Sequence, residues 1–186
     1  PICPWKEFLD LRAKATEEVH IGLVGKYDLQ DAYKSIFEAS SQASTYNNRK
    51  LKMHFINSEN IVKENVAEQL AGMNGIIIGP GAGQRGIEGK NIVARYTREN
   101  NIPTFGICLG MQMLFEKSHE YGVHQGLELI KGEVIPMENT IPKELKIPHI
   151  GWNSLKIENN NPLLKYINDG DFVYFVHSFY AADCDD

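Results

Sequence analysis

The sequence predicts an α/β fold in which helices cover both faces of a mostly parallel sheet, with further β-strands added at the C-terminal end. Up to about residue 108, apolar runs of strand length alternate with amphipathic stretches of helix length, which is typical of a parallel sheet between helices. From about residue 125 the pattern changes to strand-like pieces joined by polar or Pro-containing loops. The order expected for the core is β-α-β-α-β-α-β.

Four short stretches are predicted to form the strands of the core sheet: residues 19–25, 51–57, 74–80 and 103–108. The alternating pattern of the second stretch favours a strand near an edge, whereas NGIIIGP at 74–80 is almost wholly apolar and favours the centre. Amphipathic periodicity predicts helices between these strands, over residues 31–40, 58–70 and 87–100.

The remaining segments flank this core. A helix is expected to begin after Cys108, in LGMQMLFEK (109–117), and three later pieces are expected to be strands, within 126–137, 147–157 and 170–180. Residues 1–18 are interpreted as a linker and lead helix outside the core, so that a single domain occupies residues 19–186.

Composition narrows the classes of function. A chain of 186 residues that is 42% hydrophobic can bury one sizeable core. Its net charge of −5 and its scattered Lys and Arg residues argue against a nucleic-acid partner. It shows neither an apolar run long enough to span a bilayer nor the apolar centre of a secretion signal, so we expect no membrane association and a cytoplasmic location. Three distant cysteines form neither a disulfide framework nor a zinc pattern, and no metal is expected.

One short motif carries a chemical hypothesis. In GICLGMQ (106–112), Cys108 follows a predicted strand, precedes a predicted helix, and has Gly106 and Gly110 two residues to either side. This is the pattern of a nucleophile elbow, in which the glycines leave room for a strained turn that lifts the reactive side chain above the sheet. A helix N-terminus would favour the reactive thiolate. The alternative is a buried structural cysteine.

A thiolate that attacks a carbonyl needs hydrogen-bond donors for the developing oxyanion, and backbone N–H groups usually supply them. Leu109, next to the cysteine, offers one, and Gly81 in the loop GPGAG (79–83) offers the other. The same loop also contains GAGQRG (81–86), a match to the dinucleotide-binding pattern G-x-G-x-x-G. That pattern normally lies in the first βα turn, whereas this loop follows the third predicted strand, so the match is weak evidence for a dinucleotide.

GICLGMQ together with GPGAG resembles the class I, or triad, glutamine amidotransferases, which hydrolyse glutamine at a Cys-His-Glu site and pass ammonia to a synthase. Residues from about 4 to 112 resemble the glutaminase domain of CTP synthase, through IGLVGKY, LQDAYKSI, RGIEGK and RENNIP. Residues from about 113 to 182 resemble instead the glutaminase subunit of imidazole glycerol phosphate synthase, through MLFEKSHE, GLELIKGEVIPM, IPHIGWNS and DFVYFVHSFYA. Both resemblances imply a flavodoxin-like three-layer sandwich.

The resemblance also implies roles for individual residues. Cys108 is the implied nucleophile, and Gly81 and Leu109 are the implied oxyanion hole. The positions that match the glutamine-binding residues of the family are Gln112, Glu120, Ser178 and Phe179. The positions that match the lid through which GTP activates CTP synthase are Arg85, Gly86 and Glu88. The positions that match the surface facing the cyclase barrel of the histidine pathway are His149, Trp152 and Asn153.

The sequence departs from the family at its general base. The family places this histidine in an H-P-E motif beyond the position of VHSFY, and the 186 residues contain no H-P-E. His177 aligns with a histidine of the substrate loop rather than with the catalytic one. The domain is therefore interpreted as C-terminally incomplete, and we expect it to be weakly active or inactive by itself.

The expected function is hydrolysis of L-glutamine to glutamate and ammonia for a synthase domain or subunit, with an effect of GTP through the lid and no cofactor in this domain. Two alternatives stay open at this stage. One is a non-catalytic assembly or regulatory domain with the same fold. The other is a protein like the glyoxalases and chaperones that use an elbow cysteine, although a histidine commonly follows the cysteine there and Leu109 counts against it.

Overall fold

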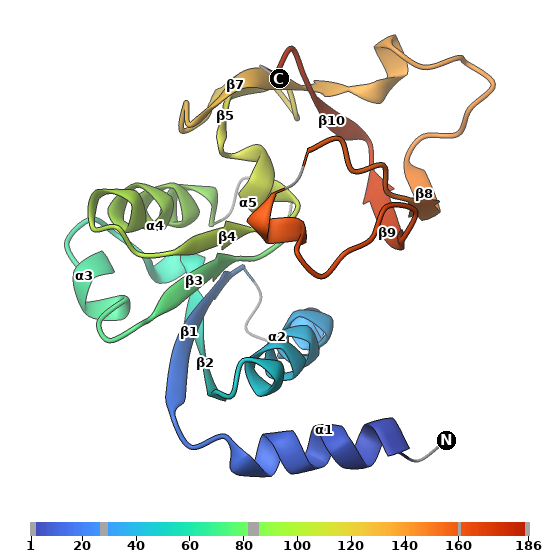
Figure 1. Cartoon of the computed structure of the whole chain (residues 1–186). Helices are drawn as coiled ribbons and strands as arrows, with labels where there is room; N and C mark the ends of the chain where they lie inside the picture. Colours follow the sequence, from blue (N-terminus) through green and yellow to red (C-terminus); the bar gives the residue numbers. More distant parts are fainter. Residues whose placement is uncertain (1–2, 27–29, 82–85, 160, 185–186) are drawn as a thin grey trace. The chain divides into compact units, whose positions relative to one another are not determined.

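The structure, a computed structural model, describes residues 3–26, 30–81, 86–159 and 161–184. The chain divides into two compact units (Figure 1). The first consists of Pro1–Leu114 with Gly126–Leu129, and the second consists of Phe115–Gln125 with Ile130–Asp186. Each unit is described by itself below.

The first unit is built on a sheet of four parallel strands. They are β1 (Glu18–Gly25), β2 (Lys50–Asn57), β3 (Gly75–Ile78) and β4 (Thr104–Gly106), in the order β2-β1-β3-β4. The predictions for these strands are confirmed: β2 lies at an edge, and the apolar β3 lies inside the sheet. Because all four strands point the same way, the loops that follow β3 and β4 leave the sheet at the same edge.

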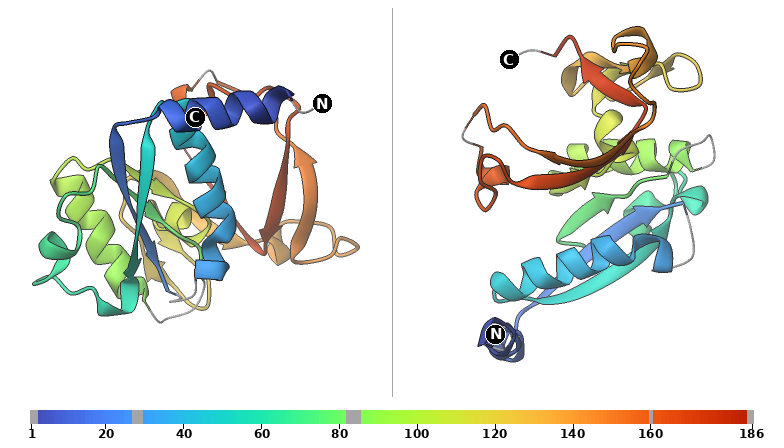
Figure 2. Two further views of the ribbon diagram at one scale, coloured as in Figure 1. Left: turned by 90° about the horizontal axis from the view of Figure 1, so that it is seen from below. Right: turned by 90° about the vertical axis from the view of Figure 1, so that its right-hand side faces the viewer.

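Helices cover both faces of this sheet. Figures 1 and 2 show α2 (Lys34–Tyr46) on one face, and α3 (Val66–Gln69) and α4 (Ile87–Glu99) on the other. A 3₁₀ turn, Gln30–Tyr33, leads into α2. The lead segment forms α1 (Cys3–Lys14), which packs on α2 through Phe8 and Tyr46, whose ring centres are 5.8 Å apart. The expected three-layer α/β sandwich is therefore confirmed.

The core of the first unit lies between the sheet and the α3–α4 layer. Apolar side chains from β1, β2 and β3 meet those of α3, of α4 and of the residues beside α3. The buried members are Val24, Ile56, Ile61, Val66, Leu70, Ile76, Ile78, Val93 and Ala94. Burying an aliphatic side chain of this size stabilises a fold by about 1.5–3 kcal/mol relative to leaving it exposed. This cluster fixes α4 against the strands whose ends carry the loop at 79–81 and Cys108.

The prediction of one continuous helix over 58–70 is wrong, because the helix is interrupted in its middle. The structure has a 3₁₀ turn at Ser58–Asn60, an extended Ile61, and then the single turn of α3. The Asn65 side chain explains the break, because it accepts a hydrogen bond from Val62 N–H at 2.9 Å and donates one to the Asn60 carbonyl at 2.8 Å. Such side-chain bonds offer the backbone an alternative to helical ones.

The helix predicted over 109–117 is also shorter than expected. The structure has one turn, α5 (Leu109–Gln112), after which β5 (Phe115–Ser118) begins and belongs to the second unit. Phe115 is buried and pairs with Ile130 of the neighbouring strand, so burial of the aromatic side chain and strand pairing outweigh the helical pattern. An apolar run of this length is compatible with either structure.

The second unit is all β apart from short 3₁₀ turns, and it confirms the predicted β additions. β10 (Phe179–Ala182), β7 (Ile130–Pro136), β5 and β6 (His124–Gln125) form one sheet in the order β10-β7-β5-β6. β8 (His149–Ser154) and β9 (Phe172–His177) form a separate antiparallel pair, in which His149 lies opposite His177. The 3₁₀ turns are Met137–Asn139 and Pro162–Leu164.

Candidate functional site

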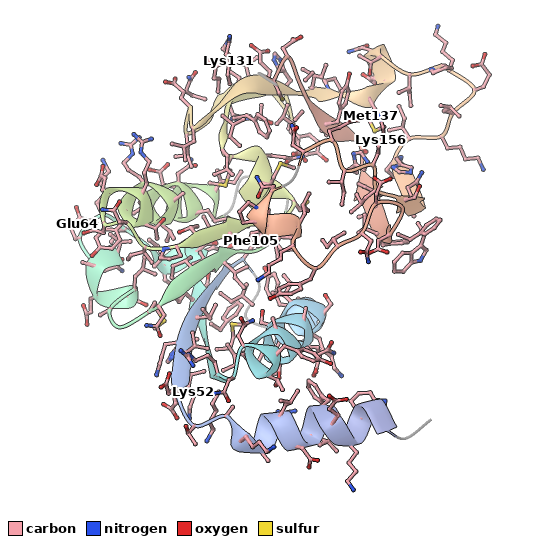
Figure 3. All side chains as sticks on the ribbon, viewed as in Figure 1. Lys52, Glu64, Phe105, Lys131, Met137 and Lys156 are labelled. Carbon is pink, nitrogen blue, oxygen red and sulfur yellow. The ribbon has the colours of Figure 1, made fainter. Side chains whose placement is uncertain are left out.

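Cys108 lies in a sharp turn between β4 and α5. Its backbone angles are φ 55° and ψ −113°, a conformation that a residue with a Cβ adopts only at a cost of about 1–3 kcal/mol. The strand that leads into the turn carries Phe105, which is labelled in Figure 3 and is partly exposed. Cys108 itself is exposed and forms no disulfide. The alternative of a buried structural cysteine is therefore wrong.

The two glycines that flank Cys108 are required by close backbone packing. A Cβ on Gly106 would collide with the Gly110 carbonyl oxygen, and a Cβ on Gly110 would collide with the Ile78 carbonyl oxygen. The Ile107 N–H also donates to that Ile78 oxygen at 3.0 Å. The turn is thus fastened to the end of β3, and the missing side chains at 106 and 110 are what allow it to lie there.

The α5 turn leaves the Leu109 N–H available. Gly110 N–H donates to the Ile107 carbonyl, while the Met111 and Gln112 N–H groups both donate to the Cys108 carbonyl. Among the described residues, Leu109 N–H donates to no backbone carbonyl. Gln112, at the end of α5, is partly buried. The sequence predicted that a helix dipole would favour the Cys108 thiolate. That effect is small here, because α5 is only four residues long.

The loop after β3 lies at the same edge of the sheet as Cys108. Gly79 N–H donates to the Val24 carbonyl at 2.9 Å, which holds the start of the loop against β1. Gly81 has φ +132°, which glycine adopts readily and other residues adopt rarely. The backbone conformation therefore explains why this position is a glycine. Gly81 and Leu109, the two residues expected to supply oxyanion donors, therefore lie on adjacent parallel strand ends of one unit.

Sequence reasoning missed Lys90, the most deeply buried charged residue near this edge. Its side chain is only 1% exposed, and its Nζ donates to the Gly79 carbonyl at 2.8 Å and to the Pro80 carbonyl at 3.3 Å. Burial lowers the pKa of Lys90 to about 8, the negative charge of an ionised Cys108 raises it, and Lys26 lowers it further. Its spacing from Val93, Ala94 and Thr97 places it on the buried face of α4, and that spacing is a signal visible in the sequence.

The predicted lid residues are described only in part. Arg85 lies outside the described residues. Gly86 has φ +78° at the start of α4, and a Cβ there would collide with Ser58 Oγ. Glu88 is exposed in the first turn of α4, where a carboxylate interacts favourably with the helix dipole. Gly86 and Glu88 thus have structural explanations that are independent of a lid.

The other residues matched to glutamine binding belong to the second unit. Glu120 follows β5 and is partly buried, and this burial raises its pKa while the charge of His124 lowers it. The Ser178 carbonyl accepts a hydrogen bond from Met137 N–H at 2.9 Å, and Phe179 begins β10 opposite Pro136. Ser178 and Phe179 are therefore held by β7 and its following turn.

The residues matched to a partner surface lie on the β8–β9 hairpin. His149 Nδ1 is 3.0 Å from His177 Nε2, and His149 Nε2 is 3.0 Å from the Asn153 side-chain amide. The opposite side of the hairpin carries large apolar side chains that are more than half exposed. We call this set the hairpin face: Ile150, Trp152, Phe172, Tyr174 and Val176. Trp152 and Tyr174 are cross-strand partners with ring centres 5.5 Å apart.

Two negative findings apply to the residues that the structure describes. They contain no cluster of three or more His, Cys, Asp or Glu side chains arranged to hold a metal ion. None of their helices is both long and apolar enough to cross a membrane.

Comparison with known proteins gives consistent matches. The model of the family "Glutamine amidotransferase class-I" matches residues 28–185. CTP synthase of Bacteroides fragilis is 62% identical over 115 residues, which is 61% of this chain and 22% of that protein. CTP synthase of Porphyromonas gingivalis is 55% identical over 111 residues, covering 59% of this chain and 21% of that protein. The chain therefore spans about a fifth of the length of these curated relatives.

A solved structure gives the same fold. The glutaminase domain of Trypanosoma brucei CTPS, with bound acivicin, matches with a TM-score of 0.68 and 24% identity, over 88% of this chain and 68% of that chain. The expected flavodoxin-like fold and the resemblance to CTP synthase are confirmed. The family match begins shortly after β1 and includes both the loop at 79–81 and the strained turn at Cys108. The chain belongs to the class-I glutamine amidotransferase family.

Proposed function

We propose that this chain is a glutaminase domain that hydrolyses L-glutamine to glutamate and ammonia for a synthase. The observation that carries the proposal is the exposed Cys108 in its strained turn, with Gly106 and Gly110 packed against backbone, in a member of this family. A backbone held in so unfavourable a conformation requires support from its surroundings, and such turns concentrate at reactive sites.

The chemistry assigned to the site has two halves. The Cys108 thiolate attacks the side-chain amide carbon of glutamine, and the Leu109 and Gly81 N–H groups donate to the oxyanion. Ammonia leaves after the amide nitrogen gains a proton, and a thioester forms. Water then cleaves the thioester, which releases glutamate and restores the thiol. Gln112, Glu120, Ser178 and Phe179 are proposed to hold the substrate.

Formation and hydrolysis of the thioester both need a general base, and the hydrogen bonds of His177 make it unsuited to this role. Its Nδ1–H donates to the Phe179 carbonyl at 2.8 Å, and its Nε2 contacts His149, so both ring nitrogens are engaged. The family uses the histidine of an H-P-E segment, and none occurs in the 186 residues. We therefore propose that these residues alone have negligible steady-state glutaminase activity, and that joining them to an H-P-E segment of the family restores it.

The ammonia-accepting partner is proposed from the second unit. Residues from about 113 to 182 resemble the glutaminase subunit of imidazole glycerol phosphate synthase, and His149, Trp152 and Asn153 match its partner surface. The exposed hairpin face supports this, because aromatic side chains are enriched at protein interfaces. We propose docking to a cyclase barrel more readily than activation by GTP, since the GTP response through Arg85, Gly86 and Glu88 needs a CTP synthase domain as well.

The test of the proposal uses the 186-residue chain and a glutamine-like chloroketone, with mass spectrometry to locate the label. Cys108 is expected to react about tenfold or more faster than Cys3 or Cys184. Cys184 is the informative control, because it is also an exposed free thiol. Equal labelling rates at all three cysteines would refute the assignment of Cys108 as the nucleophile. Failure of an H-P-E-extended version to release glutamate would favour the alternative of a non-catalytic assembly domain.

A further inference from the structure

The loop after β3 is held by two buried side chains that the proposed chemistry leaves unused. Lys90, on the inner face of α4, is 1% exposed, and its Nζ donates to the Gly79 carbonyl at 2.8 Å and to the Pro80 carbonyl at 3.3 Å. Tyr33, from the 3₁₀ turn before α2, is 2% exposed, and its hydroxyl donates to the same Pro80 carbonyl at 3.3 Å. Two parts of the first unit therefore supply donors to one carbonyl.

The end of β1 is shaped to receive the Tyr33 ring. A Cβ on Gly25 would lie 2.7 Å from the Tyr33 hydroxyl oxygen, so a larger residue at position 25 would displace the ring. The Tyr33 hydroxyl also accepts a hydrogen bond from Lys26 N–H at 3.0 Å. The tyrosine thus ties the end of β1 to the Pro80 carbonyl through hydrogen bonds on both sides of its oxygen.

These contacts leave the Gly81 N–H as the available donor of the loop. Gly79 N–H donates to the Val24 carbonyl at 2.9 Å, and proline has no N–H. The carbonyls of Gly79 and Pro80 both accept from Lys90. Among the residues that the structure describes, Gly81 N–H has no acceptor.

Peptide geometry then sets the direction of this N–H. The Pro80–Gly81 peptide is trans, so its carbonyl and its N–H point in opposite directions. Because the carbonyl is held toward Lys90 and Tyr33, the N–H points away from both. Without these donors the peptide could rotate, since glycine adopts both signs of φ readily.

Packing alone does not explain a lysine at position 90. Burying an ammonium is unfavourable, and two neutral carbonyls compensate for only part of the lost hydration. Among the described residues, the hydrogen-bond partners of Lys90 are these two loop carbonyls. An apolar side chain would fill the same space between α4 and the sheet without this penalty, so the contact with the loop indicates what the charge does.

We propose that Lys90 and Tyr33 are positioning residues of the Cys108 site, which hold the Pro80 carbonyl inward so that the Gly81 N–H stays turned outward as an oxyanion donor. The inference rests on the proposed function for its catalytic meaning, because the oxyanion forms only during attack on glutamine. Both side chains act through the backbone of the loop rather than by touching the substrate.

The first experiment measures the direction of the Gly81 N–H in the 186-residue chain, from its residual dipolar coupling in NMR. Lys90→Met and Tyr33→Phe remove the ammonium and the hydroxyl but keep most of the apolar bulk. In each variant the Gly81 coupling is expected to change by more than it does in the two matched controls, Lys52→Met and Tyr46→Phe.

The controls replace the same residue types far from the loop. Lys52 lies near the start of the edge strand β2 (Figure 3), whereas the loop leaves the opposite end of the sheet. Tyr46 is exposed at the end of α2. If Lys90→Met does not fold, Tyr33→Phe decides, because it removes only one oxygen. An unchanged Gly81 coupling in a folded variant would overturn the proposal for the residue replaced.

The second experiment tests the catalytic meaning in a chain with Cys3→Ser and Cys184→Ser, where Cys108 is the only thiol. A glutamine-like chloroketone presents a carbonyl where glutamine has its amide carbonyl, whereas iodoacetamide alkylates by displacement and needs no oxyanion donor. Relative to the iodoacetamide rate, the chloroketone rate at saturation is expected to fall about tenfold in Lys90→Met and about threefold in Tyr33→Phe. The half-saturating concentration should stay the same.

A merely structural role would loosen the Cys108 turn and slow both reagents together, so equal losses with the two reagents would overturn the proposal. The two proposals can also fail separately. A changed Gly81 coupling in a chain whose Cys108 labels no faster than Cys184 would leave the support of the loop standing and refute the glutaminase function. Fast chloroketone labelling of Cys108 with an unchanged Gly81 coupling would do the reverse.

Discussion

His149 Nδ1 lies 3.0 Å from His177 Nε2, and the two histidines are directly opposite each other on β8 and β9. Since His177 Nδ1–H donates to the Phe179 carbonyl, a neutral His177 accepts at Nε2 from the His149 Nδ1–H. The pair therefore links β8 to the start of β10 through hydrogen bonds. Such a link orients backbone and side chains rather than moving a proton to a nucleophile.

His177→Ala is expected to leave the alkylation rate of Cys108 nearly unchanged, because neither ring nitrogen of His177 is free to act as a base. Loss of a general base typically lowers a rate by about a hundredfold to ten-thousandfold. The measurement is the iodoacetamide rate at fixed pH in a background where Cys108 is the only thiol. A loss of a hundredfold or more in a folded variant would identify His177 as the base.

Gly110→Ala is expected to destabilise the chain by about 1–3 kcal/mol, since the added Cβ collides with the Ile78 carbonyl oxygen. Alanine is intrinsically the better helix former, which offsets the loss by less than about 1 kcal/mol. Gly75→Ala is the matched control, because a Cβ there makes ordinary contacts at 3.4 Å with Ile21 and Pro103. Urea unfolding followed by circular dichroism compares the two variants. Equal stabilities would show that the Cys108 turn is not packed as described.

Trp152→Ser and Tyr174→Ser are each expected to weaken docking to a cyclase barrel about tenfold or more, as truncation of central aromatic residues does at interfaces. The readout is the dissociation constant from calorimetry, supported by co-elution. Tyr166→Ser is the control, since Tyr166 is 81% exposed but lies outside the hairpin face. If the control weakens docking as much as the two hairpin variants, the hairpin face is not the docking surface.

Glu133 is expected to make stability depend on pH. His119 at 2.7 Å and Lys117 at 2.9 Å hold the pKa of Glu133 below its ordinary value of 4.5. A carboxyl whose pKa is lowered by folding stabilises the protein above its unfolded pKa, and this contribution disappears as the pH falls through the folded value. Glu133→Gln should therefore lower the urea midpoint at neutral pH, and this effect should become smaller as the pH falls below 4.5.

The control for this comparison is Glu158→Gln, which breaks the exposed pair with Lys156 (labelled in Figure 3) and should change the midpoint little at either pH. A Glu133→Gln effect of the same size at pH 7 and pH 3 would exclude a charge-based contribution.

Much of the fold was predictable because each strand of the first unit corresponds to a short local pattern of apolar residues in the sequence. NGIIIGP is almost wholly apolar and lies inside the sheet as β3, and the alternating 51–57 lies at the edge as β2. The two helix errors had causes outside the pattern: Asn65 bonds to the backbone around it, and Phe115 is buried by a strand partner that follows it in sequence. Amphipathic spacing contains neither kind of information.

The sharp turn at Cys108 was predictable, because glycines at fixed offsets indicate a backbone requirement directly. Lys90 was missed because a lysine at one position of an amphipathic helix is usually solvent-exposed. Only its spacing from Val93 and Thr97 indicated the inner face of α4. The carbonyls that accept its hydrogen bonds belong to Gly79 and Pro80, eleven and ten residues earlier in the chain. Contacts of this kind become visible when the helix is packed against the sheet.

The boundary between the two units, at Leu114 and Phe115, falls beside residue 112, where the resemblance proposed from the sequence passes from CTP synthase to the glutaminase of the histidine pathway. A recombination crossover at that point would exchange the whole of the second unit as a block. It would also exchange the strip Gly126–Leu129, which belongs to the first unit, where the Leu127 and Leu129 N–H groups donate to the Met113 and Leu114 carbonyls. Those bonds use backbone groups, but the Leu127 side chain also packs against the core of the first unit, so the exchanged segment would have to keep an apolar residue at position 127 to leave the surroundings of the Cys108 turn intact.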